Sequence, residues 1–246
     1  MAGYGEFAEV YDLLTENVPY DEIAEYYDGL IKSAGAPGML LLDMGCGTGN
    51  LTMRLAARGY DVIASDASAE MLSIAASKLT DSSIQYICQS MTETDLYGAV
   101  DIAVSTLDSI NHLESEKEIA LCFAKTAQNM NRGGLFLFDV NTVYKHRCVL
   151  AENTFIYDVD GAYCAWQNKY SPEDDSVGIE LDLFYENPDG SYDRGYESFR
   201  EIALPQERYM ALLQQAGFEV VNIYEYLTRE LPTETSEKLM FVARKL

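Results

Sequence analysis

The most constraining feature of the sequence is a glycine-rich segment that directly follows a short apolar run. The run from Met39 to Leu42 is long enough for a buried parallel strand. Gly45, Gly47 and Gly49 then occupy alternate positions, and a helical pattern begins at Leu51. A strand, a glycine turn and a helix form the nucleotide site of a doubly wound sheet. Glycine permits positive φ and close approach of a ligand, and the following helix presents its first N–H groups to that ligand.

The spacing of the glycines distinguishes this segment from other phosphate-binding motifs. A dinucleotide site has the pattern G-x-G-x-x-G, whereas the third glycine here comes one residue earlier. The lysine of a phosphate-binding P-loop is also absent from the segment. An acid, Asp43, stands at the end of the expected strand. The segment 43–49, Asp-Met-Gly-Cys-Gly-Thr-Gly, resembles the cofactor motif of class I S-adenosylmethionine-dependent methyltransferases.

The resemblance covers about 35–140 and 204–246 and implies a Rossmann-like α/β fold. Such a fold has a seven-stranded, mostly parallel sheet with helices on both faces, and its last strand is inserted antiparallel. Two helices are expected between residues 4 and 33, and in the family such helices cover the cofactor. Apolar patterns predict the remaining strands and one long helix that opens at Ser115 and runs to about Asn131. The segment Arg132-Gly133-Gly134 is expected to end this helix. These strands are expected at 39–42, 61–66, 84–88, 101–107, 135–140, 218–228 and 238–245.

Residues 143–202 do not follow the strand–helix alternation of the rest of the chain. Strand-like runs at 153–159, 162–170, 176–186 and 191–202 are separated by turn signals such as Asn-Pro-Asp-Gly. They predict a small antiparallel sheet inserted into the core. Its many aromatic residues suit a lid over an acceptor pocket, an oligomer interface, or a sheet that packs its own aromatic face. The sequence therefore predicts an N-terminal helical cap (1–34), a cofactor-binding core (35–142 and 203–246) and an inserted substrate subdomain (143–202).

The resemblance also implies which residues bind the cofactor. The glycine turn would admit the amino-acid end of S-adenosylmethionine, and Asp43 would hold that end. Asp66, at the end of the second strand, would accept hydrogen bonds from the ribose hydroxyls, as acids also do in NAD sites. Residues just after Asp66 and after the third strand would contact the adenine. The predicted cofactor set is Tyr20, Asp43, Gly45, Cys46, Gly47, Gly49, Asp66, Ala67, Met71, Gln89, Ser90, Met91, Thr106 and Leu107.

The loop after the fourth strand faces the reactive methyl group in the family. Here it supplies Asp108, Asn111 and His112 within one turn. His112 is a candidate general base, with Asp108 beside it, although a lone histidine is more often a structural hydrogen-bonding residue. The loop lacks the Asn/Asp-Pro-Pro-aromatic motif of enzymes that methylate base amines or glutamine amides, which argues against those substrates. The predicted substrate contacts are Tyr11, Asn111, Asn141, Tyr144 and Trp166.

The composition of the chain limits the classes of molecule that it is expected to bind. The net charge of −23 repels phosphate backbones, which argues against nucleic acid; it suits cationic substrates or simply a soluble surface. Five scattered cysteines predict reduced thiols in a cytoplasmic protein. Two histidines far apart in the sequence give no metal-ligand spacing, and His146, between Lys145 and Arg147, is expected to be exposed. No apolar run is long enough to cross a membrane. We expect a monomer or homodimer.

The resulting hypothesis is methyl transfer from S-adenosylmethionine to an O, N or C atom of a small molecule by in-line displacement. Two alternatives remain at this stage. An NAD(P)-dependent oxidoreductase would share the sheet and Asp66, but should show G-x-G-x-x-G and a Tyr-x-x-x-Lys set, which is missing after the fifth strand. A non-catalytic protein that binds an adenosine cofactor is the second alternative.

Overall fold

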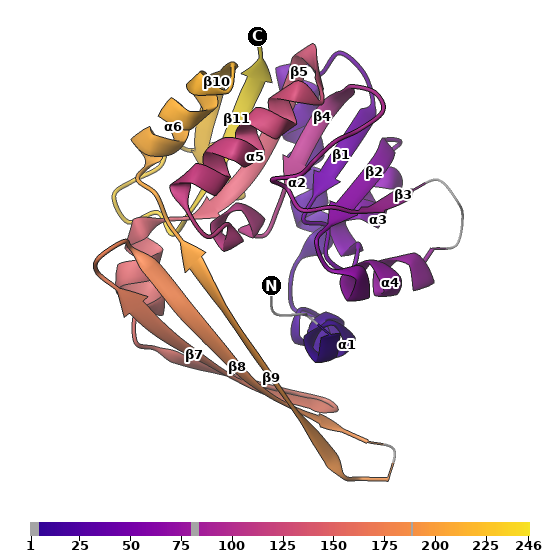
Figure 1. The fold of residues 1–246 in the computed structure, drawn as a ribbon, viewed down its shortest axis with the longest axis vertical. Helices are drawn as coiled ribbons and strands as arrows, with labels where there is room; N and C mark the ends of the chain where they lie inside the picture. Colours follow the sequence, from indigo (N-terminus) through magenta and orange to yellow (C-terminus); the bar gives the residue numbers. More distant parts are fainter. Residues whose placement is uncertain (1–4, 80–83, 188) are drawn as a thin grey trace.

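A seven-stranded sheet forms the core of the protein, in the strand order β10-β11-β5-β4-β1-β2-β3 (Figure 1). The central strands pair in parallel, whereas β11 lies antiparallel between β5 and β10. The Rossmann-like sheet with an inserted antiparallel last strand is thereby confirmed. The strands are β1 (Leu40–Met44), β2 (Asp61–Asp66), β3 (Gln85–Cys88), β4 (Val100–Ser105), β5 (Met130–Asn141), β10 (Phe218–Glu225) and β11 (Lys238–Lys245).

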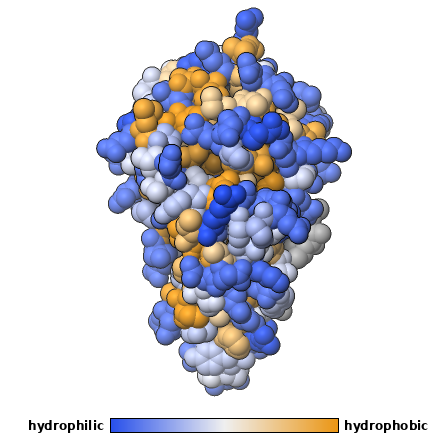
Figure 2. Space-filling model, turned by 90° about the vertical axis from the view of Figure 1, so that its left-hand side faces the viewer, coloured by the Kyte–Doolittle hydropathy of each residue, from blue (hydrophilic) through white to orange (hydrophobic). Residues whose placement is uncertain are grey.

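The computed structural model describes residues 5–79, 84–187 and 189–246. Residues 1–4 of the predicted cap lie outside the described ranges. Among the described residues, none of the helices is long and apolar enough to cross a membrane. On the face seen in Figure 2, hydrophilic residues predominate and apolar patches are interspersed among them, which agrees with the strongly acidic composition.

Helices cover both faces of the sheet. α2 (Tyr20–Ala34) and α3 (Asn50–Ala56) pack on one face, and α5 (Glu116–Gln128) and α6 (Gln206–Gln215) pack on the other. β5 shows why both layers are stable, because Leu135 and Leu137 enter the first layer while Phe136 and Phe138 enter the second. All four side chains are fully buried. A strand that is apolar on both faces belongs in the middle of a covered parallel sheet.

The start of β5 differs from the sequence prediction. The helix expected to reach residue 131 ends at Gln128, and β5 begins at Met130 rather than at Leu135. The strand register with β4 shifts here. A Cβ on Gly134 would lie 2.9 Å from the main-chain oxygens of Asn131 and Asp101. The glycine pair therefore sits inside an irregular strand start, where main chains approach closely, and does not end the helix.

The inserted segment forms the predicted antiparallel sheet, in the order β6-β7-β8-β9. Its strands are β6 (Thr154–Val159), β7 (Ala162–Ser171), β8 (Ser176–Glu186) and β9 (Tyr192–Ile202). In Figure 1 this sheet extends away from the end of the core at which β5 finishes. A π-helix, η2 (Lys145–Leu150), connects β5 to β6 and was not predicted. Alternate residues Val177, Ile179, Leu181 and Leu183 bury one face of the insert.

The two N-terminal helices contact different parts of the molecule. α2 belongs to the core layer, where Ile23, Tyr27 and Leu30 are buried against the sheet. α1 (Gly5–Leu14) instead contacts α4 (Ala69–Ser77) and strands β6, β7 and β9 of the insert. Val10 of α1 joins the apolar cluster of the insert. α1 therefore lies between the core and the inserted sheet (Figure 1).

Candidate active site

The glycine turn links the end of β1 to α3. The N–H of Gly45 donates to the carbonyl of Ser65 at the end of β2 (2.8 Å). Gly45, Gly47 and Gly49 have φ values of 72°, 53° and 77°, which disfavour any residue with a Cβ. A Cβ on Gly49 would lie 2.7 Å from the Tyr86 hydroxyl, whereas one on Gly47 would meet nothing within 4 Å. The main chain at Gly47 is therefore open to a ligand.

Asp66 lies directly opposite this opening. Its Oδ2 accepts a hydrogen bond from the N–H of Gly47 (2.8 Å), and its Oδ1 accepts one from the N–H of Ser68 (2.9 Å). Burial raises the pKa of Asp66 above its ordinary value, although these two hydrogen bonds oppose that change. Ala67 follows Asp66 in the same segment. Because the N–H of Gly47 binds the Asp66 carboxylate, the glycine turn and the predicted ribose-binding acid lie in direct contact.

Asp43 has an unsatisfied oxygen. Its side chain is buried, and Oδ2 accepts a hydrogen bond from the Thr52 hydroxyl (2.6 Å). Oδ1 is buried with no hydrogen-bond partner among the described residues. Burial, with a smaller contribution from the nearby Asp66 carboxylate, raises the pKa of Asp43 to about 6. A buried acceptor without a donor is costly, so this carboxylate suits a ligand that brings a cation or an N–H group to the glycine turn.

Asp12 fastens α1 to the glycine turn, a contact that was not predicted. Its Oδ1 accepts hydrogen bonds from the Thr48 hydroxyl (2.7 Å) and the Asn50 amide (2.8 Å), and its Oδ2 pairs with the Lys78 ammonium. Lys78 also donates to the carbonyl of Thr48 (3.0 Å). Burial acts to raise the pKa of Asp12, but these donors lower it overall. The helix between core and insert is thus tied to the predicted cofactor loop by one carboxylate.

The three predicted residues after β3 differ in their contacts. Gln89 is held within its own loop, because both ends of its amide bond to the main chain of Asp95 (3.3 Å each). Ser90 shares a hydrogen bond with Thr92 (3.0 Å). Met91 points to the glycine turn: its Cε would lie 3.1 Å from a Cβ built on Gly45. Met91 is therefore the member of this set that contacts the turn in the described structure.

Two other predicted cofactor residues are largely buried. Met71 is buried in α4, and its N–H donates to the hydroxyl of the N-cap residue Ser68 (3.1 Å). Tyr20 is buried at the start of α2, and the Arg54 guanidinium lies 5.3 Å from its ring centroid. Tyr20 joins the apolar layer under α2. The packing of Met71 and Tyr20 is thus established by the structure, while their contact with cofactor stays a prediction.

The turn after β4, which begins at the buried Thr106, adopts an unusual conformation. Leu107 and Asp108 both have left-handed φ values, 53° and 57°, which cost L-residues roughly 1–2 kcal/mol each. The buried Asp139 compensates: its two oxygens accept hydrogen bonds from the N–H groups of Leu107 and Asp108 (2.9 Å each) and from the Tyr27 hydroxyl (2.7 Å). Asp139 therefore fixes the turn that presents Asp108.

Lys238 supplies the positive charge beneath this turn. Its ammonium donates to Asp108 Oδ1 (2.6 Å) and lies 3.1 Å from Asp139 Oδ2. Burial acts to raise the pKa of Asp108, but the Lys238 and Lys145 charges hold it well below its ordinary value. The pKa of Lys238 is raised in turn by the two carboxylates, against the effect of its burial. The ion pair with Lys238 therefore favours the ionised form of the Asp108 carboxyl group.

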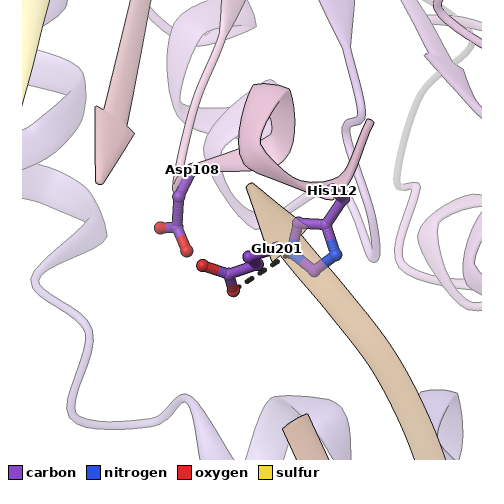
Figure 3. Close-up of side chains that lie close together, drawn as sticks. All are labelled: Asp108, His112 and Glu201. Atoms are coloured by element: carbon purple, nitrogen blue, oxygen red, sulfur yellow. Dashed lines mark ion pairs between the residues drawn. The ribbon is translucent and has the colours of Figure 1, made fainter. Parts of the chain in front are cut away.

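Asp108, His112 and Glu201 converge beside this turn (Figure 3). His112 ends the short helix η1 (Ser109–His112), and its Nε2 lies 3.8 Å from Oε1 of the buried Glu201 in β9. The His112 ring also packs against the Phe199 ring of the same strand in a tilted arrangement, with centroids 4.9 Å apart. The core thus provides an acid and an imidazole, and the inserted sheet provides a second acid.

The spacing of these three groups also permits a metal ion, since one ligand atom from each lies within 4.8 Å of the others. The hydrogen bonds of Asp108 indicate that an ammonium group, and not a metal ion, lies beside its carboxylate. Asp108 Oδ1 already accepts from the Lys238 ammonium, and Asp108 Oδ2 accepts from the Asn141 amide (3.0 Å). The charge next to Asp108 is therefore already balanced by an ammonium group of the protein.

His146 is fully buried, which contradicts the prediction that it is exposed. Its Nδ1 lies 2.7 Å from the carbonyl oxygen of Asp175, and its Nε2 lies 3.5 Å from Glu201 Oε2. His112 and His146 are far apart in the sequence, but in the structure they flank one carboxylate, that of Glu201. The turn of η2 buries His146, and the charged neighbours of His146 in the sequence gave no sign of this.

Asn111 and Asn141 connect the elements of this region. Asn111 is fully buried; its amide donates to the carbonyls of Asn141 (3.2 Å) and Ile202 (2.8 Å) and accepts from the N–H of Asn141 (2.9 Å). It therefore joins η1 to the ends of β5 and β9 and has no exposed atom for the predicted substrate contact. The Asn141 amide donates to both Asp108 and Glu201 (3.0 Å each).

The other predicted substrate residues do not meet at this cluster in a single group. Tyr144 lies at the start of η2 and lines a small cavity beside the end of β5. Trp166 lies on the buried face of the insert, next to the rings of Phe155 and Tyr157, and donates to Asn168 (2.7 Å). Tyr11 belongs to α1, directly before the residue that fastens the helix to the glycine turn.

Sequence reasoning missed Glu201, His146, Asp12 and Lys238. One signal for Glu201 was available, because β9 pairs with β8 and places Glu201 opposite the buried Val177. An acid on the apolar face of a strand requires a polar partner. The other three residues carry ordinary charged or polar signatures in the sequence and show no pattern that marks them.

Comparison with known proteins agrees with this architecture. Residues 41–134 match the family model described as a methyltransferase domain. The chain is 34% identical over 245 residues to a putative methyltransferase of Geobacillus sp. (strain WCH70), covering 98% of this chain and 99% of that protein. It is 32% identical over 244 residues to the putative methyltransferase YqeM of Bacillus subtilis (strain 168), covering 98% and 97%.

A solved structure extends the comparison to the whole fold. The crystal structure of an S-adenosylmethionine-dependent methyltransferase from Clostridium acetobutylicum ATCC 824 superposes with a TM-score of 0.88 at 26% identity, covering 98% of both chains. The core sheet, the inserted sheet and their order along the chain are thus shared at full length. The glycine turn, the acids Asp43 and Asp66 at the carboxyl ends of β1 and β2, and these relatives lead to one conclusion. The chain belongs to the class I S-adenosylmethionine-dependent methyltransferase family.

Proposed function

We propose that this methyltransferase methylates an amine nitrogen of a small molecule held between the core and the inserted sheet. The proposal goes beyond the family's activity in two respects, the kind of acceptor and the atom that receives the methyl group. The observation that carries it is the buried Glu201 carboxylate, which the insert delivers beside Asp108 and His112 (Figure 3).

The cofactor end of the site follows from the geometry of the glycine turn. The open main chain at Gly47 and the unpartnered Asp43 Oδ1 fit the amino-acid end of S-adenosylmethionine. Asp66 fits its ribose hydroxyls, because two main-chain N–H groups orient its carboxylate and each oxygen can accept a second hydrogen bond. The remaining predicted contacts are kept as proposals for the walls of this site. They are Tyr20, Cys46, Ala67, Met71, Gln89, Ser90, Met91, Thr106 and Leu107.

The acceptor end is acidic, and one of its negative charges is not balanced by a lysine or an arginine among the described residues. Among the described residues, Asp108 is paired with Lys238, whereas the ion-pair partners of Glu201 are the two histidines and include neither a lysine nor an arginine. A buried carboxylate needs a cation or a strong donor. An ammonium group on the acceptor would supply both, and an anionic acceptor would be repelled. The net charge of −23 favours the same class of substrate.

The chemistry needs few protein groups. When bound, S-adenosylmethionine supplies a methyl group on a sulfonium that is already an activated leaving group. An ammonium has no lone pair, so His112 first takes one proton from it, and Glu201 stabilises the imidazolium that forms. The freed nitrogen lone pair then forms the N–C bond as the S–C bond breaks. The core, α1 and the insert would position the acceptor and exclude water, and both effects accelerate an in-line displacement.

The titles of two solved structures with the same fold name an amino pentose methyltransferase and a sugar N-methyltransferase. One is CalS10, an amino pentose methyltransferase from Micromonospora echinaspora (TM-score 0.73, 18% identity), and the other is the sugar N-methyltransferase KedS8 from a Streptoalloteichus species (TM-score 0.77, 22% identity). They cover 92% and 96% of this chain. Their titles support amines as the first acceptors to test. Their low sequence identity to this chain establishes only that the fold is shared.

The test is a set of matched acceptor pairs. Purified protein, S-adenosylmethionine and each small amine, such as an amino sugar or an aryl-ethylamine, are compared with the hydroxyl compound that differs only at the reacting atom. Formation of S-adenosylhomocysteine and of methylated product is measured. We expect turnover with members of the amine series and none with their hydroxyl partners. Turnover confined to hydroxyl, carboxylate or carbon acceptors would contradict the proposed nucleophile.

A further inference from the structure

The side chain of Asn141 uses both ends of its amide group beside the cluster of Figure 3. Asn141 ends β5 and is 2% exposed. Its Oδ1 accepts a hydrogen bond from the Lys145 ammonium (2.9 Å), and its Nδ2 donates to Asp108 Oδ2 and to Glu201 Oε2 (3.0 Å each). An amide nitrogen carries two hydrogens, so both are used within the protein.

The neighbours of this amide fix its orientation. A lysine ammonium can only donate, so the amide oxygen must face Lys145. The opposite orientation would point the amide N–H groups at an ammonium and the amide oxygen at two carboxyl groups. This assignment does not depend on a proton at Glu201, because either form of a carboxyl group has an oxygen that accepts an N–H. Asn141 is therefore a donor toward both acids.

The Asn141 nitrogen lies between an acid of the core and an acid of the insert. Asp108 belongs to the turn after β4, and Glu201 belongs to β9. One ligand atom from each of these acids and from His112 lies within 4.8 Å of the others. Like charges at this separation disfavour each other, and a hydrogen-bond donor that both carboxyl groups share offsets the repulsion. Asn141 thus joins the core to the insert at the acceptor end.

The same contact determines which oxygen of Glu201 faces the acceptor. Oε2 receives the Asn141 N–H and lies 3.5 Å from Nε2 of the buried His146. Oε1 lies 3.8 Å from Nε2 of His112, whose side chain is 30% exposed. The bond to Asn141 therefore directs Oε1 toward His112 and the solvent-accessible side of the cluster.

We propose that Asn141 is a positioning residue whose amide fills the place between Asp108 and Glu201 that a cation would otherwise take. It holds the two acids at a fixed separation and keeps Glu201 Oε1 aimed at His112. It acts through these groups rather than as the substrate contact expected from the sequence. Its effect on methyl transfer rests on the proposed function, whereas the placement of the amide between the acids does not depend on the acceptor.

Asn141→Asp tests this placement, because it replaces the bridging nitrogen with a carboxylate oxygen and changes the shape of the side chain little. The variant would have three carboxylates and an imidazole around one point, a set of ligands that suits Mn²⁺. Lys145 can still donate to the new carboxylate. Mn²⁺ binding is measured by electron paramagnetic resonance at pH 7. We expect the variant to bind Mn²⁺ at least about tenfold more tightly than wild type.

Further variants locate the ion. Asn131→Asp is the matched control, because the exposed Asn131 amide also donates to an aspartate, Asp101 (2.9 Å); it should leave Mn²⁺ affinity unchanged. Adding Glu201→Gln to Asn141→Asp should return the affinity to that of wild type. Asn141→Ala opens the place between the acids without a new charge, so it should also bind Mn²⁺ more tightly than wild type. It serves as the test if Asn141→Asp does not fold. Calorimetric binding of S-adenosylhomocysteine shows which variants are folded.

Two results would overturn the proposal. The first is equal Mn²⁺ affinity in wild type and in the folded Asn141 variants, because the amide would then not occupy the place between the acids. The second concerns an amine acceptor found with the matched pairs. For Asn141→Ala we expect kcat to fall at least about tenfold, with a shifted pH profile and an unchanged KM for S-adenosylmethionine. An unchanged kcat and pH profile would rule out a positioning role.

The Mn²⁺ measurement separates this inference from the proposed function, because it needs no acceptor. If the matched pairs show no amine methylation but Mn²⁺ affinity rises in the Asn141 variants, the nucleophile assignment fails and the placement of Asn141 stands. If amines are methylated and all the proteins have the same Mn²⁺ affinity, the proposed function stands and the placement of Asn141 fails.

Discussion

The main-chain N–H of Gly47 donates a hydrogen bond to the Asp66 carboxylate at 2.8 Å, joining the glycine turn after β1 to the end of β2. This contact brings an open stretch of main chain and an acid together at the carboxyl ends of two adjacent parallel strands, which is where ligands bind in open α/β sheets. The glycine turn therefore does two things: it leaves space for a ligand, and it orients the carboxylate that would bind the ribose.

Substitution of Gly47 should separate binding from stability. Gly47→Ala forces a Cβ into the left-handed region (φ 53°) but into open space, so we expect a loss of about 1 kcal/mol in the free energy of unfolding. The same Cβ would enter the space proposed for the cofactor, so binding of S-adenosylhomocysteine should fall at least tenfold. Gly59→Ala is the matched control, because Gly59 has a φ of 95° and also has open space. Equal binding by both variants would count against the site.

The raised pKa of Asp43 predicts proton release on cofactor binding. The ammonium of the amino-acid end favours the ionised carboxylate, whereas unliganded Asp43 holds its proton up to a pKa of about 6. Affinity should therefore rise by up to tenfold per pH unit as pH increases from about 5 to 6, and level off above. Burial also raises the pKa of Asp66, which acts in the same direction. Calorimetry at pH 5.5 in buffers of different ionisation enthalpy measures the released proton.

Asp43→Asn tests the same linkage through stability. A carboxyl whose folded pKa is raised stabilises the fold below its unfolded pKa of about 4, and this contribution is lost as pH rises through 6. The asparagine variant keeps an acceptor for Thr52 and removes the buried charge. Unliganded Asp43→Asn should therefore unfold at a higher temperature than wild type at pH 7, and bind S-adenosylhomocysteine with weaker pH dependence. A lower melting temperature at pH 7 would contradict the burial argument.

Asp12→Asn should release α1 from the glycine turn. The variant loses the ion pair with Lys78 and keeps an acceptor for the Thr48 hydroxyl. Because the folded pKa of Asp12 is lowered, its contribution is present above about pH 4 and is lost as pH falls through the folded value. Amide hydrogen exchange should accelerate in α1 at pH 7 and leave the core sheet unchanged. Glu25→Gln, an exposed change on α2, is the control that should leave α1 protected.

The cluster of Figure 3 predicts a class of variants that bind cofactor but do not transfer the methyl group. His112→Gln should lower the rate with an amine acceptor by about 10²–10⁴-fold, the range for loss of a general base. Glu201→Gln should also lower it, because the variant loses the carboxylate that stabilises the imidazolium. Binding of S-adenosylhomocysteine should change by less than about threefold. Glu180→Gln removes an exposed carboxylate from the same inserted sheet and should be active. Full activity of both cluster variants would show that neither His112 nor Glu201 takes part in methyl transfer.

Local sequence patterns were enough to predict the architecture. The glycine motif and apolar runs predicted the core strands to within a few residues, and turn signals delimited the four strands of the insert. These patterns are local: periodicity in the strands, and glycine or proline in the turns. The start of β5 was misplaced because Gly133 and Gly134 resemble a helix stop. In the structure both lie inside β5, and the main chain of Gly134 comes close to the carbonyls of Asn131 and Asp101.

The acceptor end of the site could not be predicted in the same way. Glu201 is separated from His112 by most of the insert, and its position depends on how β9 returns to the core. Asn111 had the residue type of a substrate contact, but its amide is fully used in joining β5 and β9 to η1. His146 is buried by the turn of η2, for which the sequence carries no signal. Contacts of this kind arise from tertiary packing.

The most direct test of the account is calorimetric titration of S-adenosylhomocysteine into wild type, Asp66→Ala and Asp61→Ala. Asp61 starts the same strand at its exposed end, so Asp61→Ala controls for loss of an acid from β2. We predict binding to wild type and Asp61→Ala, affinity about 10–100-fold weaker for Asp66→Ala, and no binding of NAD to any of them. Equal affinity in all three proteins, or preference for NAD, would contradict the assignment of the cofactor to the glycine turn and Asp66.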